Sequence, residues 1–266
     1  MNTSVIKSVR AIARHFMLKS CYIHIPKTGG TYLAQLETGG EPVIWPMKYL
    51  GHCVIVDSTK LSQGYGRMVG YLDKPQIEQT DLDSFFVVST VRNPYSWLVS
   101  YAGHAGGWSE KYRDSRHYDY EIAQKGFDYL VRSIADRDSE IWPSRKFIHF
   151  AIFSLTGKLV VDWLNRTESL DGDLENLANR RMLTFRRQKK QRVGIKKDYR
   201  SFYNDALVDL VGQTWGRELE LFGYNFDGEV ANAGILGRTI TSKQREGVTY
   251  NWASDICIVN GSVIGR

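Results

Sequence analysis

The fold is decided by a stretch near the start of the chain, Ile23-His24-Ile25-Pro26-Lys27-Thr28-Gly29-Gly30-Thr31. Residues 21–26 form a short apolar-rich run that predicts a strand, and residues 31–36 have the pattern of a helix start. The two glycines between them allow the sharp turn that joins these elements. Because strand, glycine turn and helix follow in that order, the stretch predicts the opening of an α/β fold.

The same turn suits an anionic ligand. Glycines let a ligand approach the backbone closely, and a helix N-terminus offers N–H groups and a positive dipole to an anion. Thr28 and Thr31 add hydroxyl donors and Lys27 adds a positive charge, so the turn predicts a phosphate or sulfate cradle. In a Walker A loop the lysine follows the second glycine, whereas Lys27 precedes both glycines. A nucleoside triphosphate is therefore a less favoured ligand, and a glycine turn without a ligand is the structural alternative.

Strands and helices are expected to alternate along the rest of the chain. Residues 85–91 have the near-continuous hydrophobicity of a central parallel strand. The alternation predicts a single α/β domain with a central, mainly parallel sheet flanked by helices. The other elements that we expect are strands at 52–57 and 158–163 and helices at 94–101, 127–134, 144–155, 169–179 and 199–222, the last ending at Gly223.

A second anion site is predicted directly after the strand at 85–91. Arg92 would point a bidentate guanidinium at a phosphate, and Pro94 suits the first turn of the following helix. Ser100 lies on the same helix face as Ser96, and helical side chains lean toward the N-terminus, so its hydroxyl can reach the same phosphate. Two separate anion sites fit a nucleotide with 3′ and 5′ phosphates better than they fit ATP. The alternative is an ordinary ion pair for Arg92 and a packing role for Ser100.

Length and composition agree with one well-buried core, since 42% of the 266 residues are hydrophobic. We expect a basic amphipathic segment at 1–20, the main domain at 21–228 and a tail at 229–266 whose role the sequence leaves open. The first segment predicts a short helix packed on the domain, with a helix on a membrane surface as the alternative. No apolar run suits a signal peptide or a membrane span, so the expected compartment is the cytoplasm.

Charge and cysteine spacing narrow the ligand classes. The formal charge is +6, while residues 180–200 contain ten Lys or Arg and one acid, which is a local charge of +9. Such a stretch attracts a phosphorylated or polyanionic ligand or a nucleic acid, although a solvated loop without a partner has the same composition. Cys21, Cys53 and Cys257 are widely spaced without a Cys/His cluster, so neither a disulfide framework nor a metal site is expected.

Residues 23–31 closely resemble the 5′-phosphosulfate-binding loop of carbohydrate sulfotransferases, above all the heparan sulfate 2-O and 6-O sulfotransferase group and its bacterial relatives. Residues 88–101 resemble that family's 3′-phosphate-binding motif, an arginine followed eight residues later by a serine. Residues 161–170, with Arg-x-Glu-x-Leu after a strand, and residues 199–226, with Phe-Gly-Tyr after a helix, are similar to later family elements. The resemblance covers roughly residues 20–228.

This resemblance implies a P-loop-like nucleotide sulfotransferase fold and O-sulfation with 3′-phosphoadenosine 5′-phosphosulfate (PAPS), which leaves 3′,5′-ADP, without a metal. It implies that Lys27 stabilises the leaving oxygen, that the loop binds the 5′-phosphate and that Arg92 and Ser100 bind the 3′-phosphate. The acceptor would be a hydroxyl, by resemblance on a saccharide or glycoconjugate. The loop residues concerned are Lys27, Thr28, Gly29, Gly30 and Thr31.

The expected base is a histidine, because its pKa lies near neutral pH. His52 follows a glycine at a position similar to that of the family's catalytic histidine, and His104 is the second candidate. Arg166 and His104 are candidates for acceptor binding, and Arg192 and its basic neighbours are candidates for covering the nucleotide. The relatives in animal cells are membrane-anchored, and no membrane anchor is expected in this chain, so a prokaryotic or viral origin is expected. No nucleic-acid partner is expected, and the oligomeric state is not predicted.

Three rival readings stay open. One is an NTP-dependent kinase or NTPase with an atypical phosphate loop, which would bind ATP with magnesium. Another is a nucleic-acid-binding protein that uses residues 180–200, for which binding would depend steeply on salt. The third is a degenerate sulfotransferase that binds the nucleotide but transfers nothing.

Overall fold

The computed structural model describes residues 19–29, 32, 48–51, 54–56, 76–78, 82–83, 85–106, 120–136, 152–154, 156–181, 197–251, 254 and 256–264. Contacts between residues divide the chain into two compact units, each assembled from three separate segments. The first unit contains residues 1–91, 149–189 and 238–263, and the second contains residues 92–148, 190–237 and 264–266. In the described parts of the chain, no helix has the combined length and apolar character that crossing a membrane requires.

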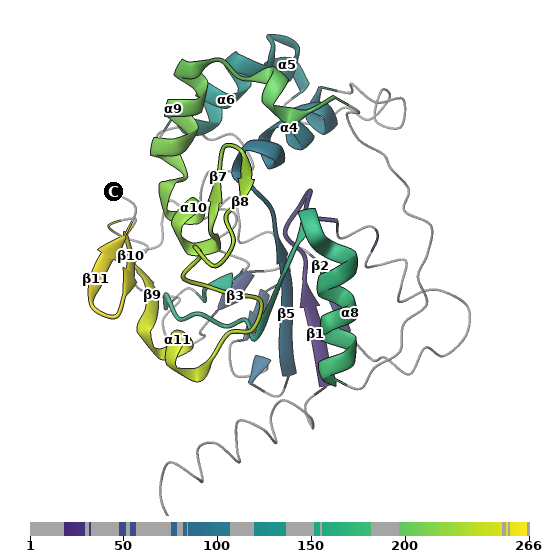
Figure 1. Ribbon diagram of the computed structural model, residues 1–266, viewed down its shortest axis with the longest axis vertical. Helices are drawn as coiled ribbons and strands as arrows, with labels where there is room; N and C mark the ends of the chain where they lie inside the picture. Colours follow the sequence, from purple (N-terminus) through teal and green to yellow (C-terminus); the bar gives the residue numbers. More distant parts are fainter. Residues whose placement is uncertain are drawn as a thin grey trace, which may run out of the picture. The chain divides into compact units, whose positions relative to one another are not determined.

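The first unit is built on a four-stranded parallel sheet in the order β2-β1-β5-β6 (Figure 1). Its strands are β1 (Lys19–Ile23), β2 (Lys48–Gly51), β5 (Phe85–Val91) and β6 (Trp163–Arg166). In β5 all residues after the first are buried, as expected for a central strand that is covered on both faces. The mixed α/β architecture with a parallel sheet flanked by helices, which the sequence predicted, is confirmed.

One face of this sheet is covered by α8 (Leu170–Arg181), which follows the short 3-10 helix η3 (Thr167–Ser169). The helix buries leucines at positions 170, 174 and 177, spaced three or four residues apart so that they share one face. They pack against aromatic side chains of the strands, Tyr22, Phe86 and Trp163. The predicted helix at 169–179 is therefore confirmed.

The C-terminal part of the chain, which the sequence left unplaced, completes the first unit. It forms α11 (Ser242–Gly247) and a three-stranded sheet of β9 (Val248–Asn251), β10 (Ile256–Val259) and β11 (Ser262–Ile264). Just before α11, Leu164 donates its N–H to the Arg238 carbonyl over 2.8 Å, and Ile240 donates to the Asp162 carbonyl over 2.9 Å. This segment thus pairs with the outer edge of β6. A separate parallel pair consists of β3 (Val54–Val56) and β4 (Gln76–Glu78).

The second unit is mainly helical. It contains α4 (Pro94–Ala105), α5 (Tyr120–Gln124), α6 (Phe127–Ala135), the 3-10 helix η4 (Tyr199–Phe202), α9 (Asp205–Thr214) and α10 (Gly216–Phe222) (Figure 1). Its core joins apolar side chains of α4, α6 and α9, among them Leu98, Leu130 and Val211. The antiparallel strands β7 (Tyr224–Asn225) and β8 (Gly228–Glu229) form a short hairpin after α10.

Two predicted elements differ from the structure. The expected helix at 199–222 is wrong as a single helix, because η4, α9 and α10 take its place. The Asn204 side chain accepts the Leu207 N–H and so starts a new helix, and Trp215 departs from helical geometry at φ −112° and ψ 22°. The strand expected at 158–163 begins only at Trp163; Lys158 and Leu159 form isolated bridges.

Other predictions are confirmed or lie outside the description. The strand at 85–91 and the helices that begin at Pro94 and near Phe127 are present. Gly223 ends α10 in the left-handed conformation at φ 71°, as its place after the helix predicted. Residues 1–18 of the predicted N-terminal helix and most of the helix at 144–155 lie outside the described ranges, and Lys19 and Ser20 belong to β1. The expectation of one domain with limits at residues 20 and 228 stays a prediction.

Candidate functional site

The parallel sheet ends at one edge where several chemically interesting segments begin. Ile23 at the end of β1 lies opposite Ser89 of β5, and Val91 at the end of β5 lies opposite Arg166 of β6. The strands therefore finish together, and the segments that follow them start from the same edge. These segments are the Pro-Lys-Thr-Gly-Gly turn after β1 and Arg92 after β5.

The strand order gives this edge a special position between β1 and β5. From β1 the chain moves to β2 on one side, whereas the later strands β5 and β6 lie on the other side of β1. The direction in which strands are added thus reverses between β1 and β5. In open α/β sheets, ligands bind outside the carboxyl ends of the strands at such a reversal, where the two connections diverge.

The turn after β1 is held by contacts within itself. Thr28 is fully buried and donates its hydroxyl to the Ile25 carbonyl over 2.6 Å, while Gly29 accepts the Tyr32 N–H over 2.9 Å. The proton of the Thr28 hydroxyl is thus used to close the turn, and its predicted contact with a phosphate stays a prediction. Tyr32 has helical geometry, in agreement with a helix start at this point.

Backbone strain in this turn is concentrated at Lys27. It has φ 64°, in the left-handed region that non-glycine residues occupy only at a cost in energy, and its side chain is half-buried. Gly29 has φ 91°, and a Cβ built there would lie 2.9 Å from Cδ2 of Leu170, the first residue of α8. The positive φ therefore favours a glycine at position 29, and any larger residue would also displace the tip of the Leu170 side chain. Strained residues of this kind cluster at ligand-binding sites.

The helix after β5 begins where the sequence predicted, whereas the contact of Arg92 with a phosphate stays a prediction. Pro94 occupies the first turn of α4, and the Asn93 side chain caps the helix by accepting the Tyr95 N–H over 3.0 Å. Arg92 donates its Nε–H to Ser96 Oγ over 2.9 Å. Ser100 is half-buried one turn further along α4. Lys27 belongs to the first unit, whereas Arg92 and Ser100 belong to the second.

The carboxyl end of the sheet also contains buried polar side chains that the sequence analysis missed. Ser89 donates to the Ile23 carbonyl over 2.9 Å, and Asn165 donates to the Thr90 hydroxyl over 3.3 Å. The three polar side chains are fully buried. Their contacts join β1 to β5 and β5 to β6 just before the strands end. The change from aliphatic residues to Ser-Thr within the strand at 85–91 was the available signal.

Arg166 lies at the end of β6 and is only 1% exposed. Its backbone N–H donates to the Asp173 carboxylate over 2.7 Å, and the same carboxylate accepts from Ser169 Oγ over 3.0 Å and from Arg238 Nε over 3.1 Å. Asp173 thus fixes the end of β6 to α8 and to the C-terminal segment. The predicted role of Arg166 in acceptor binding stays a prediction.

The histidines and thiols are placed as follows. His104 is half-buried in the last turn of α4, and His24 is half-buried after β1, where its ring stacks on Tyr22 at a centroid separation of 6.2 Å. Cys21 and Cys257 are buried thiols. No group of His, Cys, Asp and Glu that could hold a metal ion occurs among the residues with described positions. Outside those positions lie Gly30, Thr31, His52, Cys53, Lys189, Lys190, Arg192 and Lys196.

Comparison with known proteins found no matching family model, no matching curated protein and no matching solved structure.

Proposed function

We propose that this protein is a sulfotransferase that moves a sulfuryl group from PAPS to a hydroxyl of an acceptor, a saccharide or glycoconjugate. The observation that carries the proposal is the position of the lysine–glycine turn. It follows β1 where the strand order β2-β1-β5-β6 reverses, and Arg92 follows β5 on the other side of that reversal. Nucleotides bind at such points in open parallel sheets.

The residues of the turn fit a phosphosulfate group. Gly29 has φ 91°, and Tyr32, three residues later, has helical geometry; the start of a helix presents backbone N–H groups to an anion. Lys27 holds its positive charge in this turn despite a left-handed backbone that glycine or asparagine would adopt with less strain. Backbone strain of this kind supports a functional role for the residue that bears it.

Sulfuryl transfer needs positioned charges more than covalent help from the protein. Bound PAPS supplies an activated sulfur, and the acceptor oxygen forms its bond to sulfur as the bond from sulfur to the 5′-phosphate oxygen breaks. In the proposal Lys27 stabilises the negative charge on that departing oxygen. Arg92 and Ser100 hold the 3′-phosphate, and His52 takes the acceptor proton, with His104 as the alternative base.

The proposal is tested by binding of 3′,5′-ADP. We expect the nucleotide to raise the melting temperature in the presence of EDTA, because saturation at about 100 times Kd adds ~2.7 kcal/mol to the stability of the folded state. Lys27→Ala and Arg92→Ala should each remove the shift, while Lys243→Ala, a change at an exposed lysine of α11, should leave it intact.

The outcome of this titration also separates the rival functions. Absence of a shift with 3′,5′-ADP, together with magnesium-dependent binding of ATP, would replace the proposal with a kinase or NTPase. A chain that binds the nucleotide but transfers no label from labelled PAPS to any saccharide, lipid or small glycoside would be a degenerate sulfotransferase. In an active chain, His52→Ala should keep nucleotide binding and lose transfer.

A further inference from the structure

The side chain of Arg92 is tied to the first turn of the helix that follows it. Its Nε–H donates to Ser96 Oγ over 2.9 Å, and Ser96 Oγ donates its own proton to the Asn93 carbonyl over 3.2 Å. That carbonyl also accepts the Trp97 N–H over 2.8 Å, the first backbone hydrogen bond of the helix. The Ser96 hydroxyl therefore connects the guanidinium of Arg92 to the backbone of α4.

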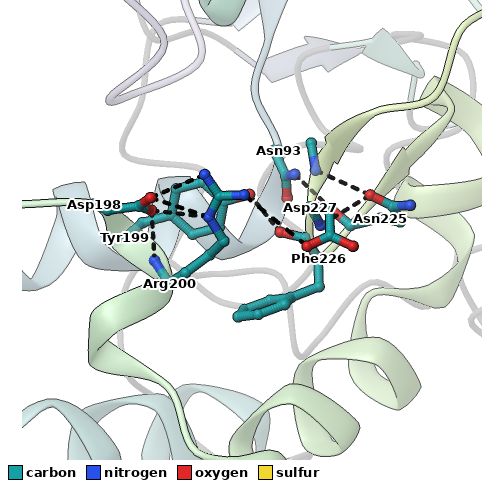
Figure 2. Close-up of polar contacts among 8 residues, drawn as sticks. Asn93, Asp198, Tyr199, Arg200, Asn225, Phe226 and Asp227 are labelled. Atoms are coloured by element: carbon teal, nitrogen blue, oxygen red, sulfur yellow. Dashed lines mark hydrogen bonds and ion pairs between the residues drawn. The ribbon is translucent and has the colours of Figure 1, made fainter.

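Asn93 is itself fixed on both sides. It is 1% exposed, its Oδ1 accepts the Tyr95 N–H over 3.0 Å, and its Nδ2 donates to the Asn225 carbonyl over 2.8 Å. Figure 2 shows the Asn93 amide directed at that carbonyl, beside the turn of the β7–β8 hairpin. Asn225 Oδ1 accepts the backbone N–H groups of Asp227 and Gly228, each over 2.9 Å, so the hairpin turn is closed by its own hydrogen bonds.

We infer that Ser96 and Asn93 are positioning residues that set the direction of the Arg92 guanidinium. Because Nε–H is donated to Ser96 Oγ, this hydrogen bond fixes the orientation of the guanidinium plane relative to the first turn of α4. An arginine side chain has many rotamers, so fixing it before the ligand arrives lowers the entropic cost of binding. The inference rests on the proposed function, because it assigns the 3′-phosphate as the anion that Arg92 meets.

Ser96→Ala removes the hydrogen bond from Arg92 to Ser96. The substitution should not destabilise α4, since alanine has the highest helix propensity. We expect the affinity for 3′,5′-ADP to fall by about tenfold, which corresponds to the ~1.4 kcal/mol of one hydrogen bond to a charged group. The affinity for 5′-AMP, which lacks the 3′-phosphate, should not change. A purely structural role would weaken both nucleotides alike, so the ratio of the two affinities is the decisive measurement.

Ser201→Ala is the matched control. Ser201 is an exposed residue of η4 in the same unit, and its hydroxyl also donates to a backbone carbonyl, that of Asp198, over 2.7 Å. We expect this variant to keep both affinities. Asn93→Ser is a second test, because serine still caps a helix but is too short to keep the bond to Asn225. This variant should also lower the affinity for 3′,5′-ADP relative to the affinity for 5′-AMP.

If folded Ser96→Ala and Asn93→Ser variants both keep the wild-type ratio of the affinities for 3′,5′-ADP and 5′-AMP, the inference is overturned. The proposed function would still stand. If the wild-type chain itself binds 5′-AMP as tightly as 3′,5′-ADP, the 3′-phosphate site is absent. The inference and the assignment of PAPS as donor would then both fail.

Discussion

At the scale of single residues, Lys27 combines a charge with an unfavourable backbone. A left-handed conformation costs a non-glycine residue about 1–2 kcal/mol, and replacement by glycine would relieve this strain. Part of the relief is offset because glycine has a larger conformational entropy in the unfolded chain. We therefore expect Lys27→Gly to raise the free energy of unfolding by up to about 1 kcal/mol and to abolish 3′,5′-ADP binding. Thermal unfolding and a nucleotide titration on the same variant measure both effects.

Asn232→Gly provides the matched control, because Asn232 is exposed and has a similar φ of 58°. Asparagine tolerates this conformation better than lysine does, so its replacement should stabilise the protein less and should leave nucleotide binding unchanged. A Lys27→Gly variant that binds 3′,5′-ADP like the wild type would contradict a ligand-binding role for this side chain.

At the scale of elements, Tyr203 connects η4 to the start of α4. Its hydroxyl donates to the Tyr95 carbonyl over 2.8 Å, and its ring packs edge-on against Tyr95 and Phe226. Burial raises the pKa of Tyr203 well above its usual value of 10.0, and the nearby Tyr95 and Tyr199 raise it further. The phenol is therefore neutral in the folded protein under conditions in which the unfolded chain would already lose the proton.

The pH dependence follows from that raised pKa. The contribution of Tyr203 to stability is fully present below about pH 10 and is lost as pH rises from there toward the folded-state pKa, by up to ~1.4 kcal/mol per pH unit. Tyr203→Phe should lose about 1 kcal/mol at neutral pH and should show a shallower decline above pH 10. Denaturant unfolding between pH 8 and about pH 11 measures both slopes. Parallel curves for wild type and variant would contradict the prediction.

Elements with strong local signals could be predicted from the sequence. The strand at 85–91 follows from a nearly continuous apolar run, and the start of α4 follows from Asn-Pro. The end of α10 follows from Gly223. The continuous helix at 199–222 was wrong because apolar spacing alone does not register a cap such as Asn204 within a helical pattern. Local sequence patterns also predicted the lysine–glycine turn after β1 and the position of Arg92 after β5.

Contacts between distant segments could not be predicted in this way. Asp173 accepts from Arg166, Ser169 and Arg238, and the last of these lies 65 residues away in the chain. Which strand lies beside β1 depends on loop closure and burial, for which a single sequence carries no periodic signal. The reversal between β1 and β5, on which the proposed function depends, is a property of the assembled sheet.

At the scale of the whole molecule, each compact unit is assembled from segments that are distant in the chain. The first unit takes residues 238–263 from the C-terminal part, after the chain has passed through the second unit. This segment pairs with β6 through backbone hydrogen bonds and forms two ion pairs, one with α8 and one with the residue that precedes β6. Arg238 contacts Asp173 over 3.1 Å, and Arg245 contacts Asp162 over 3.0 Å. The side chains of the two aspartates are only 6% and 9% exposed.

A chain shortened to end at Gly237 should therefore lose the fold of the first unit, although all four strands of its parallel sheet remain. Removing one partner of a buried ion pair costs about 3–5 kcal/mol, and two such losses approach the roughly 5–15 kcal/mol that hold a domain together. We expect rapid hydrogen exchange throughout β5 and no binding of 3′,5′-ADP. A chain that ends at Val259 keeps both ion pairs and loses only β11, whose Val263 is 42% exposed, so it should keep the protection of β5. Equal protection of β5 in the two shortened chains would mean that the sheet is stable without its C-terminal segment.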